Sequence, residues 1–292
     1  MLLGGPIPDW LLSWAIVGAI FTLMFHLGMS IVPNDFRLAA RQPALLLKGL
    51  FAVLIAVPAL GLVVVRCFDL PHPVEVGIML MAISPGAPVV LRRTLMAGGD
   101  KSLATVLQIA VAGLAVVFMP LWIVGLDEVY QSSATIDPQH LGRQVVMLQV
   151  LPLCLGMLVR HLSPDRATSI SRRLGPLAML LLVLVIILML FASWHLVVGA
   201  GWQAVLAIVI LTLLALALGH FLGGPAASSR TVLASLSAGR NPGLALVVAA
   251  FNGAATGVIA TILAYLFVSA LTAIPYLIWR RRLADKSGIA AS

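Results

Sequence analysis

The chain has 292 residues, of which 61% are hydrophobic and only 10% are charged. A soluble domain carries about 45–50% apolar and about 25% charged residues, so this composition excludes an ordinary soluble enzyme and a disordered chain. Two cysteines are too few for a disulfide scaffold, and the strands of a membrane β-barrel would alternate apolar with polar residues. The composition therefore predicts an all-α polytopic membrane protein.

Nine segments are long and apolar enough to cross a bilayer, which takes about 20 residues of helix. In chain order they are 10–32, 43–65, 74–96, 103–126, 141–161, 174–193, 200–222, 228–250 and 258–279. Proline, glycine or charged residues mark most of the boundaries between them. We therefore treat 1–292 as a single membrane domain with nine transmembrane helices.

The net charge of +8 is explained by membrane topology rather than by nucleic-acid binding, because basic residues gather in cytoplasmic loops. If the N-terminus lies outside, twelve basic residues fall inside: Arg37, Arg41, Lys101, Arg160, Arg166, Arg172, Arg173, Arg230, Arg280, Arg281, Arg282 and Lys286. Only Arg66 and Arg143 then fall outside. We expect a multi-pass protein of a plasma or inner membrane, with its N-terminus outside and its C-terminus in the cytoplasm.

The third and eighth segments carry helix breakers near their middles, Ser-Pro-Gly-Ala-Pro at 84–88 and Gly-Arg-Asn-Pro-Gly at 239–243. Proline removes an amide donor and clashes with the preceding turn, so neither segment can be a continuous helix. The breaks lie five segments apart, and this odd offset gives the two segments opposite directions. We therefore predict an inverted repeat, in which segments 1–4 match segments 6–9, with a binding site at the two breaks. Two unrelated proline kinks are the alternative.

Arg240 places a charge at the second break, near the middle of the membrane, where it needs a partner or water. Its five donors can satisfy the carbonyls at which the first half-helix ends. We predict that the half-helix N-termini at Val89 and Gly243 face an anionic group of a substrate. A purely structural role for Arg240 is the alternative.

Further candidates come from polar residues near the breaks. Arg92 is predicted to line an inward-facing cavity, with snorkelling to the interface as the alternative for it and for Arg93. His26 is a candidate proton relay or a packing residue, and Gln108 is available to a cavity or to an interhelical hydrogen bond. The predicted substrate-binding residues are Arg240, Asn241, Pro85, Gly86, Pro88, Gly243, Arg92, Gln108 and His26. No catalytic residue, metal ligand or cofactor is predicted.

Several short motifs, taken in order, resemble the bile acid:sodium symporter family from roughly Leu23 to Arg282. They are Met-Phe-His-Leu-Gly-Met-Ser at 24–30, Pro-Asn-Asp-Phe at 33–36, Gln42-Pro43, Pro58, Pro-Gly-Ala at 85–87, Ala-Gly-Gly-Asp at 97–100, and Gly239 and Asn241 followed by Leu-Ala-Leu at 244–246. The resemblance implies ten helices, or nine without the first, and alternating access between a panel and a core. It assigns 10–32, 141–161 and 174–193 to the panel, and 43–65, 74–96, 103–126, 200–222, 228–250 and 258–279 to the core, where two discontinuous helices cross.

The chain departs from this family where the resemblance implies sodium ligands. Where the family has a Ser-Asn pair after the first break, this chain has Val90-Leu91, and where the family has a Ser and a Thr on the next helix, it has Ala104 and Gln108. At the second break, Ser237 stands in place of a Glu, and Asn241-Pro242 in place of a Gln and an Asn. A Gln of the family's second span is Val53 here. Sodium needs several oxygen ligands, and apolar side chains supply none. These departures argue against sodium coupling. We predict that the guanidinium of Arg240 takes the place of the missing sodium ions.

We therefore predict a secondary transporter of small organic anions that works without sodium. The spans contain basic residues but no deeply placed acidic ones, which favours anions. The chain has no Gly-x-x-x-x-Gly-Lys-Ser/Thr motif, so gradients would supply the energy, and a proton or an exchanged anion are both open as coupling partners. An enzyme is not expected, because neither His-Glu-x-x-His nor Gly-x-Ser-x-Gly occurs. The alternatives are a non-transporting membrane sensor or partner subunit and ordinary sodium-coupled symport.

Overall fold

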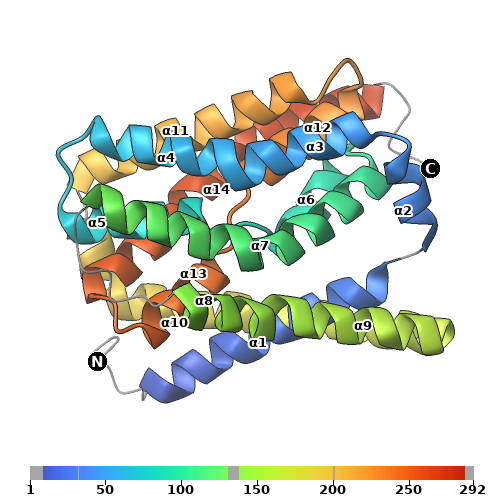
Figure 1. Ribbon diagram of the computed structural model, residues 1–292, viewed down its shortest axis with the longest axis horizontal. Helices are drawn as coiled ribbons and strands as arrows, with labels where there is room; N and C mark the ends of the chain where they lie inside the picture. The colour runs from blue at the N-terminus through green and yellow to red at the C-terminus, as the bar shows by residue number, and fades with distance from the viewer. Residues whose placement is uncertain (1–8, 32, 131–137, 200, 287–292) are drawn as a thin grey trace.

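The computed structural model describes residues 9–31, 33–130, 138–199 and 201–286, and its regular structure there is helical (Figure 1). The helices are α1 (Asp9–Ser30), α2 (Pro33–Ala40), α3 (Pro43–Phe51), η1 (Ala52–Ala56), α4 (Val57–Arg66), α5 (His72–Ala82), α6 (Pro88–Met96), α7 (Lys101–Tyr130), α8 (Pro138–Val145), η2 (Val146–Val150), α9 (Leu151–Leu162), α10 (Pro164–Gly199), α11 (Gly201–Leu222), α12 (Ala227–Ala238), α13 (Pro242–Phe251) and α14 (Thr256–Lys286). The two η elements are single turns of π-helix that join the α-helices on either side of them.

Helices lie within each of the nine segments expected to span the membrane, and the third and eighth segments each consist of two helices separated by a break. Among the described residues, six helices are long and apolar enough to cross a bilayer, and the pair α1 and α2, bent by 81°, would make a seventh. The predicted class, an all-α polytopic membrane protein, is confirmed. The short helix α2 was not predicted, and α10 begins at Pro164 rather than near 174, because a helix can continue through polar residues beyond the hydrocarbon core.

Three long segments pack together on one side of the molecule. Helix α1 runs along both α9 and α10, at the bottom of Figure 1, while α3, α4, α11 and α12 lie at the top. Gly28 and Gly156 allow α1 and α9 to touch: a Cβ on Gly28 would lie 2.9 Å from the amide nitrogen of Met157, and one on Gly156 would lie 2.9 Å from that of Met29. Small residues permit such close helix contacts in membranes, so this pair fixes α1 against α9.

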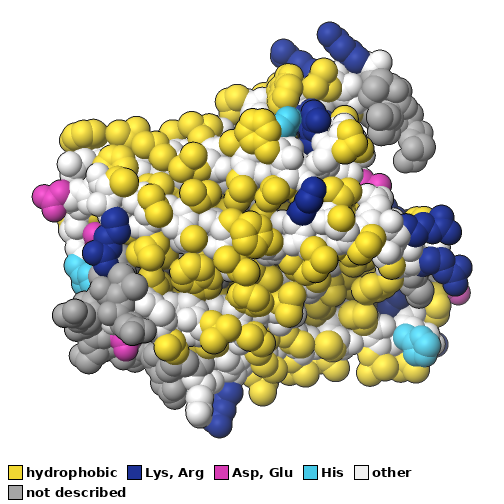
Figure 2. Space-filling view, turned by 45° about the horizontal axis from the view of Figure 1, so that its top comes forward, with side chains coloured by type: hydrophobic (Ala, Val, Ile, Leu, Met, Phe, Trp, Pro, Cys, Tyr) yellow, Lys and Arg dark blue, Asp and Glu magenta, His cyan; other side chains and the backbone are white. Residues whose placement is uncertain are grey.

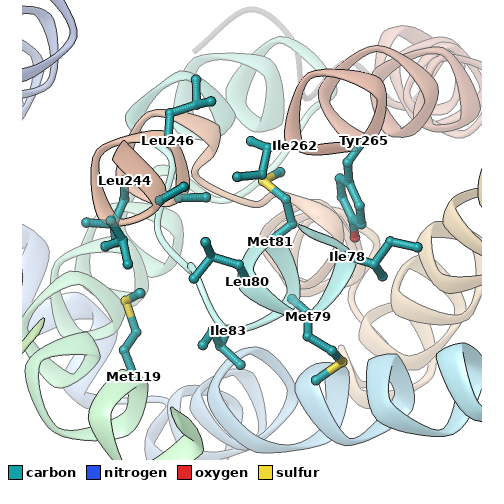
Figure 3. Close-up of a cluster of buried hydrophobic side chains, with 14 of the residues drawn as sticks. Ile78, Met79, Leu80, Met81, Ile83, Met119, Leu244, Leu246, Ile262 and Tyr265 are labelled. Atoms are coloured by element: carbon teal, nitrogen blue, oxygen red, sulfur yellow. The ribbon is translucent and has the colours of Figure 1, made fainter. Parts of the chain in front are cut away.

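The core and the surface are both apolar, as a lipid environment requires. Hydrophobic side chains cover most of the face shown in Figure 2, and most of the charged side chains on it lie toward the margins. Inside, α5, α7, α13 and α14 contribute side chains that point toward one another (Figure 3), including Ile78, Met119, Leu244 and Ile262. Most residues of α5 and α13 are buried, so packing holds these two short helices within the protein.

Candidate functional site

The two predicted breaks are present and lie against each other in the middle of the molecule. Helix α5 ends at Ala82 and α12 ends at Ala238, and the extended chain after each pairs antiparallel through Pro85 and Arg240. The Asn241 amide donates to the Ser84 carbonyl oxygen over 2.8 Å. Gly86 turns the first break with a φ of 83°, a left-handed conformation that favours glycine. The geometry therefore joins two chain segments that are about 155 residues apart in the sequence.

Arg240 is 5% exposed, and its guanidinium donates to three backbone carbonyls. Nη1 donates to the oxygens of Ala82, at 2.9 Å, and of Val53, at 3.1 Å, while Nη2 donates to the oxygen of Ser237. Ala82 and Ser237 belong to the last turns of α5 and α12, where carbonyls have no partner within their own helix and carry partial negative charge. The guanidinium thus caps both half-helices at once.

The third carbonyl is free because of a local irregularity upstream of Pro58. In the π-turn η1 the Val57 amide donates to Ala52, five residues back, and so leaves the Val53 oxygen without its usual helical donor. Pro58 has no N–H to donate to Leu54, whose oxygen accepts instead from the Trp122 indole nitrogen at 2.8 Å. Arg240 and Trp122 therefore satisfy the two carbonyls that the turn releases.

Several polar atoms beside the breaks are buried without a partner in the described part of the chain. Asn241 Oδ1 accepts from the Leu244 amide at 3.1 Å and caps α13, whereas its Nδ2 has no partner. The side-chain amide nitrogen and oxygen of Gln108 and the Ser237 hydroxyl are also buried without a hydrogen-bond partner in the described residues. Gln108 Nε2 lies 3.5 Å from the place that a Cβ on Gly86 would occupy, so Gln108 lies directly behind the first break.

A cavity of about 350 Å³ lies between the breaks and the α1–α10 side. Its walls come from α1, α6, α10, the second break and α14. The lining residues are Ile20, Leu23, Ala87, Val89, Arg93, Met179, Leu182, Val183, Ile187, Arg240, Asn241, Pro242, Gly243, Leu266, Phe267 and Ala270. These include two arginines and one asparagine but no acidic side chain, so the cavity suits an anion with an apolar body.

The cavity brings together some of the residues predicted from the sequence and separates others. Arg240, Asn241 and Gly243 line it, as do Val89 near the start of α6 and Pro242 at the start of α13. Pro85 and Gly86 are buried in the first break. Pro88 begins α6, and its side chain lies outside the described residues.

Two predicted side chains take other positions. Arg92 is exposed on α6, and the neighbouring Arg93 is the one that lines the cavity. His26 lies between α1 and α10, where Nδ1 is 2.9 Å from the Ser171 hydroxyl and where Gly175 faces the ring. This environment matches the packing alternative for His26 rather than a place in the cavity.

Neither the place of Arg93 in the cavity nor the apolar wall from α10 was predicted from the sequence. Val89 and Arg93 are four residues apart and share one face of α6, so the start of that helix at Pro88 was the signal that could have selected Arg93 over Arg92. No comparable signal existed for α10, because which face of an apolar helix meets a cavity depends on packing.

Comparison with known proteins identifies the family. Residues 17–200, more than half of the chain, match the model of the Sodium Bile acid symporter family. The chain belongs to this family. The family consists of transporters rather than enzymes, as predicted.

The relatives are distant. The chain is 26% identical over 224 residues to the probable sodium/metabolite cotransporter BASS1, chloroplastic, of Arabidopsis thaliana, covering 75% of this chain and 55% of that protein. It is 25% identical over 214 residues to the sodium-dependent organic anion transporter of Rattus norvegicus, covering 73% of this chain and 55% of that protein. The chain thus spans about half the length of the curated relatives that it matches.

Proposed function

We propose that the protein is a secondary transporter of small organic anions that works by alternating access and does not need sodium. The names of two relatives, a sodium/metabolite cotransporter and an organic anion transporter, support the substrate class. The cavity with two arginines and no acidic lining supports the sign of the charge. The observation that carries the proposal is the guanidinium of Arg240 bound to three carbonyls where the two broken helices meet.

The Arg240 guanidinium occupies the kind of place that a coupling cation takes in other transporters. Carbonyls at the C-terminal ends of half-helices and in unwound backbone are the usual sodium ligands at such breaks. Here two such oxygens, of Ala82 and Ser237, and the Val53 oxygen of the π-turn already accept from Arg240. A sodium ion would bring a second positive charge into a weakly polarisable interior. Val90 and Ala104 offer no side-chain oxygen at two further positions where sodium ligands were expected from the family resemblance.

The membrane topology that we propose has nine spans, with the N-terminus outside and the C-terminus in the cytoplasm. In this topology α5 with α6, and α12 with α13, each form one broken span, because the shorter apolar helices are about half the usual crossing length. The antiparallel pairing of the two breaks is the arrangement expected of an inverted repeat. The excess of basic residues in the segments assigned to the inside supports the orientation.

Alternating access would come from movement of a panel, α1 with α9 and α10, against a core that contains both breaks. The Gly28–Gly156 contact joins α1 to α9, so the panel can move as a unit. Across the cavity its contacts with the core are apolar, as between Ile20 and Gly243, and apolar surfaces can slide without breaking hydrogen bonds. The driving gradient would be that of the substrate itself, of a proton or of an exchanged anion.

Flux and stability measurements in two salts test the proposal. Purified protein in liposomes should take up at least one of radiolabelled taurocholate, pyruvate and 3-phenylpropionate above the level of empty liposomes, equally in NaCl and in KCl. Uptake only in NaCl would mean ordinary symport and would contradict sodium independence. Saturable binding without uptake would mean a non-transporting sensor and would contradict transport.

A variant without the Arg240 guanidinium tests whether this group replaces a sodium ion. Arg240→Ala leaves three carbonyls facing a vacated site, so sodium should raise the melting temperature of this variant but not that of the unchanged protein. Arg92→Ala, which removes an exposed arginine nearby, is the matched control and should show no sodium response. Stabilisation of the unchanged protein by sodium would show that Arg240 does not replace the ion.

A further inference from the structure

We infer that Arg93, rather than Arg240, is the residue that binds the anionic group of the transported molecule, and that this group is a carboxylate or sulfonate on an apolar body. The inference rests on the proposed function, since it assigns a role at the same site. Its test, however, needs neither transport nor sodium. Both arginines line the 350 Å³ cavity and a smaller one of about 50 Å³ beside it, so position alone does not choose between them.

Arg240 already uses its terminal nitrogens. Nη1 and Nη2 donate to backbone carbonyls, and within the described residues only Nε has no partner. If these nitrogens turned toward a substrate, the carbonyl ends of α5 and α12 would be left buried and unpaired, which is unfavourable. Arg240 can therefore add positive potential to the cavity without leaving its own acceptors.

Arg93 is the guanidinium with free donors. It is half-buried on α6, and in the described part of the chain it has no hydrogen-bond or ion-pair partner; its Nε is buried as well. A half-buried guanidinium without a partner is unfavourable, whereas a carboxylate or sulfonate can bind its planar fork through two parallel hydrogen bonds. The free donors make Arg93 the complementary partner that such an anion needs.

The position of Arg93 also connects the breaks with one end of the molecule. It lines a third cavity, of about 160 Å³, together with Met96, Leu277 and Arg281. Arg281 belongs to the basic end of α14, which the charge pattern assigns to the cytoplasm. Arg93 is thus the residue that the linings of the central cavity and of the cavity near that end have in common, and this position suits it to receive an anion that enters or leaves there.

The other residues that line the central cavity indicate which kind of body the transported anion carries. Apart from the two arginines and Asn241, the central cavity is lined by apolar side chains and glycine. An anion with one charged group fits this lining, because a second charge would meet Leu182, Val183 or Phe267 without a partner. The chemistry points to a mono-anion with an aliphatic or aromatic body.

The test measures how strongly the cavity prefers anions. In a protein with Cys67→Ser and Cys154→Ser, Ala270→Cys places a single thiol in the cavity that both arginines line. Its rate of modification is measured with two methanethiosulfonate reagents of similar size, one carrying an anionic ethylsulfonate and the other a cationic ethyltrimethylammonium group. Basic clefts with low-dielectric walls concentrate anions by about tenfold or more, so the rate ratio should favour the sulfonate.

The variants then assign that preference to one residue. Arg93→Gln should reduce the ratio by about tenfold, whereas Arg92→Gln, its exposed neighbour, should leave it unchanged. Arg93→Met, which keeps the length and apolar packing of the side chain, replaces the glutamine variant if that one is not recovered folded. An unchanged ratio in the Arg93 variants, an equal fall in Arg92→Gln, or a thiol that reacts with neither reagent would overturn the inference.

A second measurement separates this inference from the proposed function. 3-Phenylpropionate should protect the introduced thiol, its neutral amide 3-phenylpropanamide should protect it much less, and this difference should disappear in Arg93→Gln. Protection by acid and amide alike would overturn the inference. If charge-dependent protection occurs in a protein that shows no uptake, the anion site stands and the transport proposal fails.

Discussion

One wall of the central cavity is made of broken backbone and arginines, and the opposite wall, from α1 and α10, is made of aliphatic side chains. On the first wall, position is fixed by hydrogen bonds, such as those of Arg240 to Ala82 and Val53. On the second, the side chains that line the cavity are apolar and are held by packing, while the hydrogen bond between His26 and Ser171 joins α1 to α10. We infer that the two walls have different roles: the broken-helix wall binds the charged group of a substrate, whereas the apolar wall excludes water and can slide against the core.

The largest expected effect comes from removing the central guanidinium. Arg240→Met should lower the free energy of unfolding by about 3 kcal/mol, because three buried carbonyls lose their donor while the buried charge is also removed. Thermal unfolding of the purified protein measures it, with Arg92→Met as the control. A melting temperature equal to that of the control would contradict the role of hydrogen bonds on the broken-helix wall, since it would mean that packing alone holds the two breaks together.

The panel side should be sensitive to size instead of charge. Gly28→Ala should destabilise the protein by about 1–3 kcal/mol, because the new methyl group would meet the backbone of α9. Gly18→Ala, on the same helix but with open space at the Cβ position, should be neutral or slightly stabilising. Equal melting temperatures for the two variants would show that α1 and α9 are not held by this contact.

The apolar wall should affect affinity more than stability. Leu182→Ala shortens one of the apolar α10 side chains that line the cavity, so the affinity for 3-phenylpropionate should fall by about tenfold. Acetate, which lacks that body, should protect the thiol introduced at Ala270 equally well in both proteins. A similar loss for acetate would indicate that Leu182 shapes the anion site itself.

The smallest effect is expected at the second carbonyl of the π-turn. Trp122→Phe removes the donor to Leu54 but leaves an aromatic ring at the position, and should lower the free energy of unfolding by about 1 kcal/mol. Chemical denaturation compared with Arg240→Met provides the measurement. If Trp122→Phe were the more damaging of the two, the cation would not be the main support of the broken-helix wall.

Most of the fold could be predicted from the sequence, because hydrophobic length and helix-breaking residues act locally. The helices follow the nine predicted segments, and both breaks lie where proline and glycine placed them. Arg240 was identified for the same reason: a charge among apolar residues stands out in any sequence. The site was only partly predictable, since Arg92 and Arg93 differ by one position and the sequence does not say which one turns inward.

The sequence by itself determined the helical membrane class, the family and the position of the interruptions, since each depends on residues close together in the chain. Only the tertiary structure decided which carbonyls Arg240 binds, because Val53, Ala82 and Ser237 come from three separate helices. It also decided that Arg93 shares the cavity with α10 and that His26 does not. Apolar helices look alike along the chain, and their rotation and neighbours are fixed only when they pack against one another.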